Sequence, residues 1–279
     1  MTNPPKTILI TGCSSGIGYD AAHTLAKRGW RVFATCRAEA DCDRLRTEGL
    51  ESLRLDYTDE GSISSTLQEV LQRTGGTLDA LFNNGAYAIP GAMEDVPRDA
   101  MRAIFEANVF GWHDLTNRVV PVMRTQGYGR IVNCSSVLGL VSMPWRGAYN
   151  ASKFAIEAIS DTLRLELRQT GIKVVLIEPG PITTAFRANA KREFDRWINW
   201  RQSALKDLYA NRLVARLNDA AQTKDRFELP PSAVTAKLIL AIESPRPKAR
   251  YFVTVPTYIA DIMRRLLPTR LLDTILAGG

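Results

Sequence analysis

The sequence predicts a single α/β domain with a doubly wound parallel sheet of seven strands and helices on both faces of that sheet. Short apolar runs alternate along the chain with longer segments of helical periodicity, a pattern typical of parallel strands joined by helical crossovers. The 279 residues are 45% hydrophobic, which suits one large core. No internal repeat or linker divides residues 1–279.

Seven apolar runs have the length of buried strands, and each strand-to-helix spacing fits a right-handed crossover. The expected strands are Thr7–Thr11, Arg31–Thr35, Ser52–Leu55, Leu78–Phe82, Arg130–Cys134, Lys173–Ile177 and Tyr251–Val255. The expected helices lie near Ile17–Arg28, Ile63–Arg73, Pro97–Thr125, Tyr149–Gln169 and Pro231–Ile242.

Two further segments follow a different pattern. Residues 185–229 are irregular, aromatic and charged, and they lie between the last two strands, so we expect them to form a lid over a substrate site. Residues 256–279 are apolar with interspersed arginines and predict a C-terminal helical tail. Pro268 should break this tail into two short helices.

The composition argues against several classes of protein. No run of about 18 to 20 uncharged apolar residues is present, so we expect no membrane-spanning helix. No positively charged leader precedes the first strand, so we expect a cytoplasmic protein rather than a secreted one. We expect no metal site, because the histidines are far apart in sequence and the cysteines lack ligand spacing and have the pattern of reduced thiols. These residues are His23, His113, Cys13, Cys36, Cys42 and Cys134.

The net charge of +7 is concentrated in the last third of the chain. From residue 185 onward there are 17 Lys and Arg against 9 Asp and Glu, whereas the rest of the chain carries 19 against 20. A basic segment favours phosphorylated cofactors or anionic surfaces, although solvated helix faces are the plainer explanation. No zinc-finger, basic-zipper or RNA-recognition signature accompanies the charge, so we expect no nucleic-acid partner.

A glycine-rich turn directly follows the first strand and opens the first helix. Its sequence is Gly12-Cys13-Ser14-Ser15-Gly16-Ile17-Gly18. Gly12 permits a tight turn, Gly16 allows the backbone to approach a pyrophosphate, and Gly18 lets the helix pack closely on the strand. The helix N-terminus then offers free N–H groups and a positive dipole end to the phosphates. In this setting the turn indicates a Rossmann-type dinucleotide site; the alternative is a glycine-rich turn without a ligand.

The end of the second strand predicts a preference for NADP(H) over NAD(H). A site specific for NAD usually places Asp or Glu there to bind the ribose hydroxyls, whereas this chain has Cys36 followed by Arg37. A guanidinium at this point can grip the 2′-phosphate of NADP, and Ser14 or Ser15 can add a hydroxyl contact. Two alternatives stay open: Arg37 is an ordinary surface arginine, or the nearby Glu39 favours NAD.

Tyr149 and Lys153 lie at positions i and i+4, which places a phenol and an ammonium on the same face of a helix. The pKa of free tyrosine is about 10, and a neighbouring cation together with the positive ring of an oxidised nicotinamide favours the phenolate. Tyr149 can then take a proton from an alcohol or donate one to a carbonyl oxygen, and Lys153 can also orient the nicotinamide ribose. Taken alone, the two residues would be a surface pair.

Ser136 lies thirteen residues before Tyr149, at the end of a predicted strand. Its hydroxyl can hold and polarise a substrate oxygen without consuming a proton. Ser135 is the competing candidate, and either serine could simply cap the local backbone.

Six segments between about Thr7 and Thr184 occur in a specific order. They are the glycine turn, Asn83-Asn84-Gly85-Ala86, Asn108-Val109-Phe110-Gly111, the Ser136 segment, Tyr149-x-x-x-Lys153 and Pro179-Gly180. Together they resemble the ordered motifs of the short-chain dehydrogenase/reductase family. The resemblance implies a catalytic tetrad of Asn108, Ser136, Tyr149 and Lys153. In such a tetrad Asn108 bends its helix and holds a water that links Lys153 to solvent as a proton relay.

The same resemblance extends to the cofactor site. Asp56 and Tyr57 match the position that contacts the adenine, and Ile182 and Thr184 match positions that touch the nicotinamide carboxamide. The remaining cofactor-binding residues that the motifs imply are Asn83, Gly85, Pro179 and Gly180.

The chain departs from the family pattern after the fourth strand. The family usually has Asn-Asn-Ala-Gly, whereas this chain has Asn83-Asn84-Gly85-Ala86. The exchange moves the residue that best tolerates close backbone approach by one place. We expect a slightly shifted cofactor contact and retained activity.

Variable segments should set the substrate. Apolar side chains between Ser136 and Tyr149 and aromatic side chains of residues 185–229 can enclose a bulky apolar molecule, although helix-core packing is the alternative for at least half of them. The glycine turn, Ala34–Arg37 and Glu178–Ile182 resemble the hydroxysteroid and retinol dehydrogenase branch and its bacterial relatives, which implies steroids, retinoids or aldehydes as substrates. The pocket residues that we expect are Val137, Leu138, Met143, Trp145 and Phe186.

The sequence therefore predicts an NADP(H)-dependent oxidoreductase that interconverts a carbonyl and an alcohol. A catalytically silent NADP(H)-sensing regulator with the same fold is the alternative, and a nucleotide-sugar epimerase is disfavoured because its Gly-x-x-Gly-x-x-Gly turn is absent. The resemblance implies a homodimer or homotetramer packed through the helices that start near Pro97 and Tyr149. The tail either makes weak contact with a membrane surface, closes the pocket or docks on a partner subunit.

Overall fold

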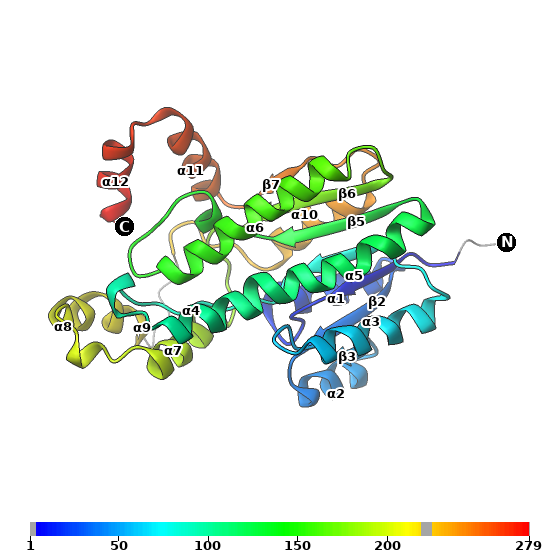
Figure 1. Ribbon diagram of the computed structural model, residues 1–279, viewed down its shortest axis with the longest axis horizontal. Coiled ribbons are helices and arrows are strands. Elements are labelled where there is room, and N and C mark those ends of the chain that lie inside the picture. Colours follow the sequence, from blue (N-terminus) through cyan, green and yellow to red (C-terminus); the bar gives the residue numbers. More distant parts are fainter. Residues whose placement is uncertain (1–3, 219–224, 279) are drawn as a thin grey trace.

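The central feature of the computed structural model is a seven-stranded sheet in which every neighbouring pair of strands is parallel (Figure 1). The strand order is β3-β2-β1-β4-β5-β6-β7, so the chain reverses its direction of winding between β1 and β4. The structure describes residues 4–218 and 225–278. Residues 219–224 of the predicted lid and residue 279 of the predicted tail lie outside the described residues. The Rossmann-type, doubly wound fold is confirmed.

The strands coincide with the seven predicted apolar runs. They are β1 (Thr7–Ile10), β2 (Arg31–Cys36), β3 (Glu51–Arg54), β4 (Ala80–Asn83), β5 (Gly129–Cys134), β6 (Ile172–Glu178) and β7 (Arg250–Phe252). Consecutive residues point to opposite faces of the sheet, and both faces are covered, so the central strands β1 and β4 are buried throughout, whereas the edge strands β3 and β7 are only partly buried. In β1, for example, Ile8 and Ile10 pack into one core layer and Leu9 packs into the other.

Helices cover both faces of the sheet. Side chains of α1, α2 and α10 pack into one layer, and those of α3, α5 and α6 pack into the other. These helices are α1 (Gly16–Lys27), α2 (Glu39–Thr47), α3 (Glu60–Thr74), α5 (Gly111–Gln126), α6 (Gly147–Glu166) and α10 (Ser232–Glu243).

Two helical features differ from the expectation. Helix α2 was not predicted, because it is strongly polar and buries only Cys42 and Leu45. The helix expected over Pro97–Thr125 is divided into α4 (Arg98–Phe105) and α5 by a π-helical turn, Glu106–Phe110. Wide turns of this kind are frequent at functional sites, and this one contains Asn108.

A third core cluster lies beyond the carboxyl ends of the strands, toward which the strand arrows point in Figure 1. It joins α4 and the start of α6 to helices from residues 185–218, and its fully buried centre is Tyr209. The latter helices are α7 (Phe186–Trp197), α8 (Lys206–Leu208), the π-helical turn Tyr209–Val214 and α9 (Ala215–Leu217). The segment predicted as a lid therefore packs at the edge of the sheet where ligands of this fold bind.

The C-terminal tail forms two helices, α11 (Val255–Leu266) and α12 (Thr269–Ala277), with Pro268 between them as expected. Helix α11 buries Thr257, Ala260 and Asp261, whereas no residue in the described α12 is buried. Within residues 4–218 and 225–278, no helix combines the length with the apolar character that a membrane span requires.

A pair of identical truncations tests this core assignment. Leu81 in β4 is 0% exposed and Leu266 in α11 is 75% exposed. Leu81→Ala leaves a cavity under α3 and α5 and should lower the free energy of unfolding by about 2–5 kcal/mol. Leu266→Ala should change it by less than about 0.5 kcal/mol. Urea denaturation measures both, and equal effects would contradict the assignment.

Candidate active site

The glycine turn between β1 and α1 has no room for side chains at two positions. Gly12 has a φ of 69°, and a Cβ there would lie 2.6 Å from the Cα of Gly85. A Cβ on Gly18 would overlap the carbonyl oxygen of Gly12. The turn therefore packs directly against the start of α1 and against the segment after β4. This contact also explains why a glycine is needed at position 85, since a Cβ there would crowd the ring of Tyr57 at 3.3 Å.

The N-terminus of α1 is open toward the turn. Ser15 occupies the N-cap position without a side-chain capping bond, and the first turn of the described helix carries no acidic residue. Free N–H groups and a positive dipole end remain for an anion. The residues therefore fit the pyrophosphate of a dinucleotide. Thr184 lies above this turn, because a Cβ on Gly16 would be 2.8 Å from its methyl group.

Arg37 follows the last residue of β2 and is exposed. No ion pair joins it to a residue of the described chain, whereas Glu39 is bound to Arg46 at 2.6 Å. Glu39, the residue that could favour NAD, is thus paired with Arg46. Ser14 is also held in place, because its carbonyl accepts a hydrogen bond of 2.7 Å from Arg44.

Tyr57, which matches the adenine-contacting position, and Asn83, in the motif after β4, form hydrogen bonds within the protein interior. The hydroxyl of Tyr57 donates to Thr11 Oγ1 at 2.7 Å and lies 2.9 Å from Asn83 Oδ1, and burial raises the pKa of this phenol. The amide of Asn83 donates in turn to Thr116 and Asn133. Asp56 remains partly exposed after β3, where Oδ1 accepts from the backbone N–H of Thr58.

The catalytic candidates converge where β5 and α6 meet. Tyr149 and Lys153 lie on one side of α6, and Lys153 Nζ is 5.5 Å from the centroid of the Tyr149 ring. The ammonium donates to the carbonyl of Cys134 at 2.8 Å, at the end of β5. Ser136, which follows Cys134 by two residues, lies near the Tyr149 phenol and lowers its pKa. Phenol, hydroxyl and ammonium thus form one cluster at the carboxyl edge of the sheet.

Burial dominates the proton equilibria of this cluster. It raises the pKa of Tyr149, while the hydrogen bond with Ser136 lowers it. Burial also lowers the pKa of Lys153 to about 8, although Cys134 and Glu157 oppose this change. Desolvation thus outweighs the effect of Ser136 on the Tyr149 phenol. That Lys153 and an oxidised nicotinamide together favour the phenolate stays a prediction.

The geometry distinguishes the two serines. Ser136 lies beside the phenol, and its Oγ accepts from the N–H of Leu138 at 3.1 Å. Ser135 is buried on the other side, beside Glu157 and Gly139. Ser136 is therefore the serine placed to contact a substrate oxygen near Tyr149.

Asn108 is fully buried in the π-helical turn. Its side chain accepts from the N–H of Tyr87 at 3.1 Å and donates to the carbonyl of Tyr87 at 2.8 Å. It also donates to Ser152, one residue before Lys153, at 3.2 Å. Asn108 thus links the segment after β4 to the helix that carries Tyr149.

The predicted substrate residues surround Tyr149 on its open side. Val137, Leu138, Met143 and Trp145 belong to the same apolar cluster as Tyr149. The ring of Phe186, at the start of α7, lies edge-on at 5.3 Å from the Tyr149 ring. The cluster also contains four aromatic residues of the predicted lid segment, which pack between helices, the alternative to a substrate contact: Phe194, Trp197, Trp200 and Tyr209.

The loop before α6 holds Trp145 in an unusual backbone conformation. Its φ is 65°, a region that bulky residues rarely adopt. The carbonyl of Trp145 accepts from the N–H of Gly91 at 2.9 Å, and its ring lies 4.9 Å from that of Tyr209. These contacts fix the wall of the cluster next to Tyr149.

Trp112 was not identified from the sequence. Its indole N–H donates to the carbonyl of Gly85 at 2.7 Å, and its ring lies 4.5 Å from Lys153 Nζ. It therefore joins the exchanged Gly85 position to the catalytic ammonium. No sequence signal marks it, because a tryptophan on the apolar face of a helix is ordinary core.

A family model described as short chain dehydrogenase matches residues 6–194. The chain belongs to the short-chain dehydrogenase family. It is accordingly an oxidoreductase of that family, as the motifs implied.

Individual relatives support the assignment to this family. The chain is 43% identical over 273 residues to the uncharacterized oxidoreductase YbbO of Escherichia coli K12, covering 98% of this chain and 94% of that protein. It is 34% identical to mouse retinol dehydrogenase 16, covering 97% and 87% of the two chains. A short-chain dehydrogenase/reductase structure from Burkholderia phymatum in complex with NAD has a TM-score of 0.78 at 26% identity, covering 99% and 96% of the two chains. The predicted likeness to retinol dehydrogenases and bacterial relatives is thus confirmed.

The buried lysine of this short-chain dehydrogenase gives a pH-dependent prediction. The pKa of Lys153 is about 8 in the folded chain and 10.5 when unperturbed. Below pH 8 Lys153 is charged in both the folded and the unfolded chain, so its burial opposes folding in full. Between pH 8 and pH 10.5 the unfolded chain binds more protons than the folded chain, and the free energy of unfolding therefore rises with pH. Lys153→Met removes this burden. The free energy of unfolding of Lys153→Met should therefore exceed that of the parent chain most near pH 7. This excess should decrease by about 2 kcal/mol toward pH 10.5.

Urea denaturation of both chains at the two pH values measures the difference, in which contributions from other titrating groups cancel. A relative stability that grows with pH would contradict the burial of a charged Lys153.

Proposed function

We propose that this protein is an NADP(H)-dependent oxidoreductase that interconverts a carbonyl and an alcohol on an apolar substrate, with Tyr149 as general acid and base. One observation carries the proposal. The phenol of Tyr149, the hydroxyl of Ser136 and the ammonium of Lys153 share one site beside the glycine turn. Together these groups can hold a substrate oxygen and exchange a proton with it.

The chain's own residues have distinct roles in this proposal. When bound, NADPH supplies a hydride to the carbonyl carbon. Ser136 donates a hydrogen bond to the carbonyl oxygen, and Tyr149 transfers its phenolic proton to that oxygen as charge develops there. Lys153 supports the resulting phenolate, and Asn108 holds the start of the proton path to solvent. Oxidation of an alcohol uses the same groups in reverse.

The free chain is prepared for proton donation. Because burial raises the pKa of Tyr149, the phenol keeps its proton near neutral pH. A protonated phenol suits reduction of a carbonyl, whereas the phenolate needed for oxidation requires added positive charge. That charge is what an oxidised nicotinamide ring brings when bound.

The preference for NADP(H) rests on Arg37 and its surroundings. Arg37 is exposed at the adenosine end of the turn, while Glu39 is bound to Arg46. An available guanidinium favours a 2′-phosphate. The similar Burkholderia phymatum structure holds NAD, so the preference has to come from these residues rather than from the fold. We also assign cofactor contacts to the open turn and to Pro179, Gly180, Ile182 and Thr184.

An apolar substrate follows from the surroundings of Tyr149. Val137, Leu138, Met143, Trp145 and Phe186 supply almost no polar groups, which suits a steroid, retinoid or aldehyde held by its single oxygen. Residues 185–229 act as the lid of this site. A screen of NADPH oxidation with ketosteroids, retinal and aliphatic aldehydes tests the proposal. A chain that binds NADPH and oxidises it with none of them supports the silent regulator instead.

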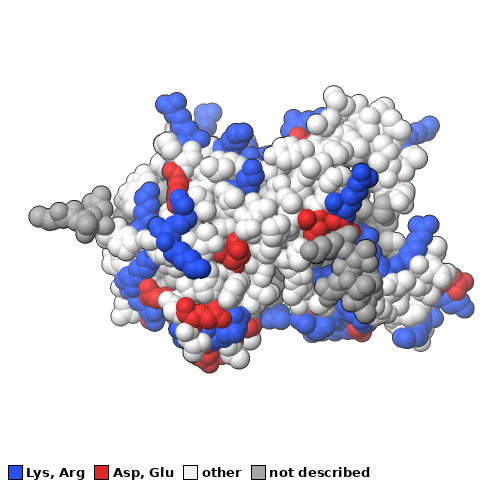
Figure 2. All heavy atoms as spheres, turned by 180° about the vertical axis from the view of Figure 1, so that it is seen from behind, with Lys and Arg blue, Asp and Glu red and all other residues white. Residues whose placement is uncertain are grey.

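The assembly and location of the protein form a further part of the proposal. Exposed Phe110, Phe154 and Leu165 lie on the turn before α5 and on α6, where they can pair copies of the chain into a dimer or tetramer. Figure 2 shows that the lobe of α11 and α12 carries few charged side chains on the face in view. This lobe favours weak contact of a cytoplasmic protein with a membrane surface.

Removal of the phenolic proton tests the chemistry. Tyr149→Phe keeps the ring that packs on Phe186 and removes only the hydroxyl. NADPH binding should therefore persist, while the turnover number falls by about 100-fold or more, the size expected of general acid–base catalysis. Fluorescence titration and steady-state kinetics measure the two quantities. Near-normal turnover would refute the role of Tyr149.

Charge reversal at Arg37 tests the cofactor preference. Arg37→Asp should weaken NADPH binding by about 100-fold, because a favourable contact with the 2′-phosphate becomes repulsive, and should change NADH binding by less than about threefold. Lys27→Asp makes the same charge change at the far end of α1 and serves as the control. Equal losses for both cofactors would remove the assignment.

A further inference from the structure

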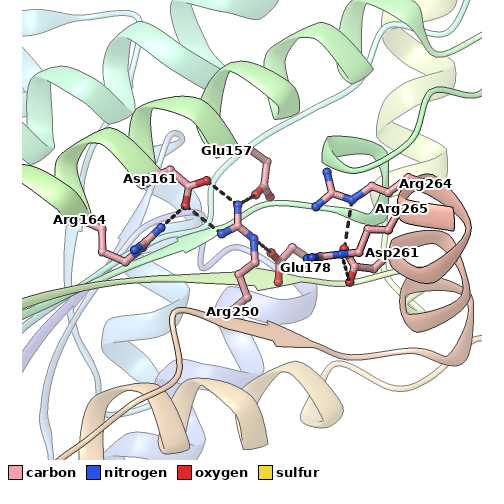
Figure 3. A network of polar contacts seen from close by, with 8 residues as sticks. All are labelled: Glu157, Asp161, Arg164, Glu178, Arg250, Asp261, Arg264 and Arg265. Carbon is pink, nitrogen blue, oxygen red and sulfur yellow. Dashed lines mark hydrogen bonds and ion pairs between the residues drawn. The ribbon is translucent and has the colours of Figure 1, made fainter.

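A cluster of charged side chains lies behind the catalytic cluster and contains residues of α6, β6, β7 and α11 (Figure 3). Arg250 of β7 stands at its centre. Around it lie carboxylates from α6 and β6, and the cluster ends in charged residues of α11. Its members are Glu157, Asp161, Arg164, Glu178, Arg250, Asp261, Arg264 and Arg265.

The guanidinium of Arg250 contacts three carboxylates at once. It binds Asp161 through two parallel hydrogen bonds of 2.8 Å, and Nη2 also donates to Glu157 at 2.8 Å. Its Nε forms an ion pair of 3.2 Å with Glu178. Only 22% of the Arg250 side chain is exposed, and that of Glu178 is fully buried. In the described chain, Glu178 has no other cation within ion-pair distance.

The carboxylates belong to the helix that carries Tyr149 and Lys153 and to the strand that precedes the segment assigned to the cofactor. Glu157 lies one turn of α6 after Lys153 and two turns after Tyr149. Glu178 is the last residue of β6 and precedes Pro179, the start of the segment assigned to the nicotinamide. Arg250 therefore ties the helix of the proton-transfer groups to the segment that faces the cofactor.

Two further contacts hold that segment, one through the backbone and one through a threonine side chain. The carbonyl of Pro179 accepts from the N–H of Val137 at 2.8 Å, next to Ser136. Gly180 packs against Thr254, between β7 and α11, so closely that a Cβ would overlap the threonine hydroxyl. A shift of β7 would thus be transmitted to Pro179 and to the position of Ser136.

Stability alone is a poor explanation for this cluster. Burying two carboxylates against one cation costs solvation, and apolar side chains of similar size commonly serve as well or better. Burial raises the pKa of both Glu157 and Glu178, with Arg250 acting in the opposite direction. What an arginine adds is a rigid fork that fixes the relative position of its partners.

We propose that Arg250 is a positioning residue that holds the segment Pro179–Thr184 in place relative to Tyr149 and Lys153 on α6. The proposal rests on the function proposed above. It concerns only the nicotinamide half of the site, because β7 and the adenosine-side strands β2 and β3 lie toward opposite edges of the sheet.

Ligands that report separately on the two halves of the cofactor test the proposal. The adenosine half is probed by calorimetry with ADP or 2′,5′-ADP, whichever the parent chain binds more tightly. The nicotinamide half is probed by the fluorescence of bound NADPH or NADH, chosen in the same way. Arg250→Met removes the guanidinium, and Arg250→Lys keeps the charge without the fork. Arg164→Met is the matched control, since Arg164 binds Asp161 but makes no ion pair with Glu157 or Glu178 in the described chain.

In both Arg250 variants the adenosine probe should bind within about twofold of the parent chain, whereas the reduced cofactor should bind about tenfold more weakly in Arg250→Met and lose its nicotinamide fluorescence enhancement. The affinity of Arg250→Lys for the reduced cofactor should lie between those of Arg250→Met and the parent chain. If Arg250→Met does not fold, Arg250→Lys provides the test. Arg164→Met should match the parent in both probes.

Unchanged nicotinamide fluorescence in a folded Arg250 variant, or equal loss of both probes, would overturn the positioning role. Failure of the parent chain itself to bind either reduced cofactor would instead refute the proposed function, on which this role depends.

Discussion

The ammonium of Lys153 lies in the protein interior, and the surrounding elements are arranged to hold it there. It donates to the carbonyl of Cys134 at the end of β5, faces the ring of Trp112 from α5, and shares α6 with Tyr149. Burial of a cation costs free energy, which is visible in the lowered pKa of this lysine. Stability alone therefore does not account for a lysine at this position.

The same buried surroundings set the state of the proton on Tyr149. Lys153 lies against the face of the ring, whereas Ser136 contacts the hydroxyl. Desolvation is the largest influence on the pKa of this phenol and raises it. A nicotinamide ring bound nearby would change this balance, so that the acid and base forms of Tyr149 follow the oxidation state of the cofactor.

Local sequence pattern predicted much of this structure, because most strands are buried apolar runs and the glycine turn, the segment after β4 and the Ser136 segment lie at strand ends. Helix α2 was not predicted, because it buries only two side chains and its polar sequence has little hydrophobic periodicity. The choice between Ser135 and Ser136 depended on which neighbouring side chain faces α6, a property of the folded strand end. The sequence analysis did not identify Arg250 as a site residue, because its partner Glu157 lies 93 positions away in the sequence. Contacts of such separation have no local pattern.

The closeness of Thr184 to Gly16 couples the glycine turn to the surroundings of Tyr149. The Thr184 methyl group lies against Gly16, so a ligand that covered Gly16 would displace Thr184. The N–H of Phe186 is bonded to Thr184 Oγ1 at 3.2 Å, and the Phe186 ring covers Tyr149. Withdrawal of the threonine would carry this aromatic cover away from the phenol. The glycine turn and the aromatic cover over Tyr149 are thus linked through Thr184 and Phe186, two residues of one short loop.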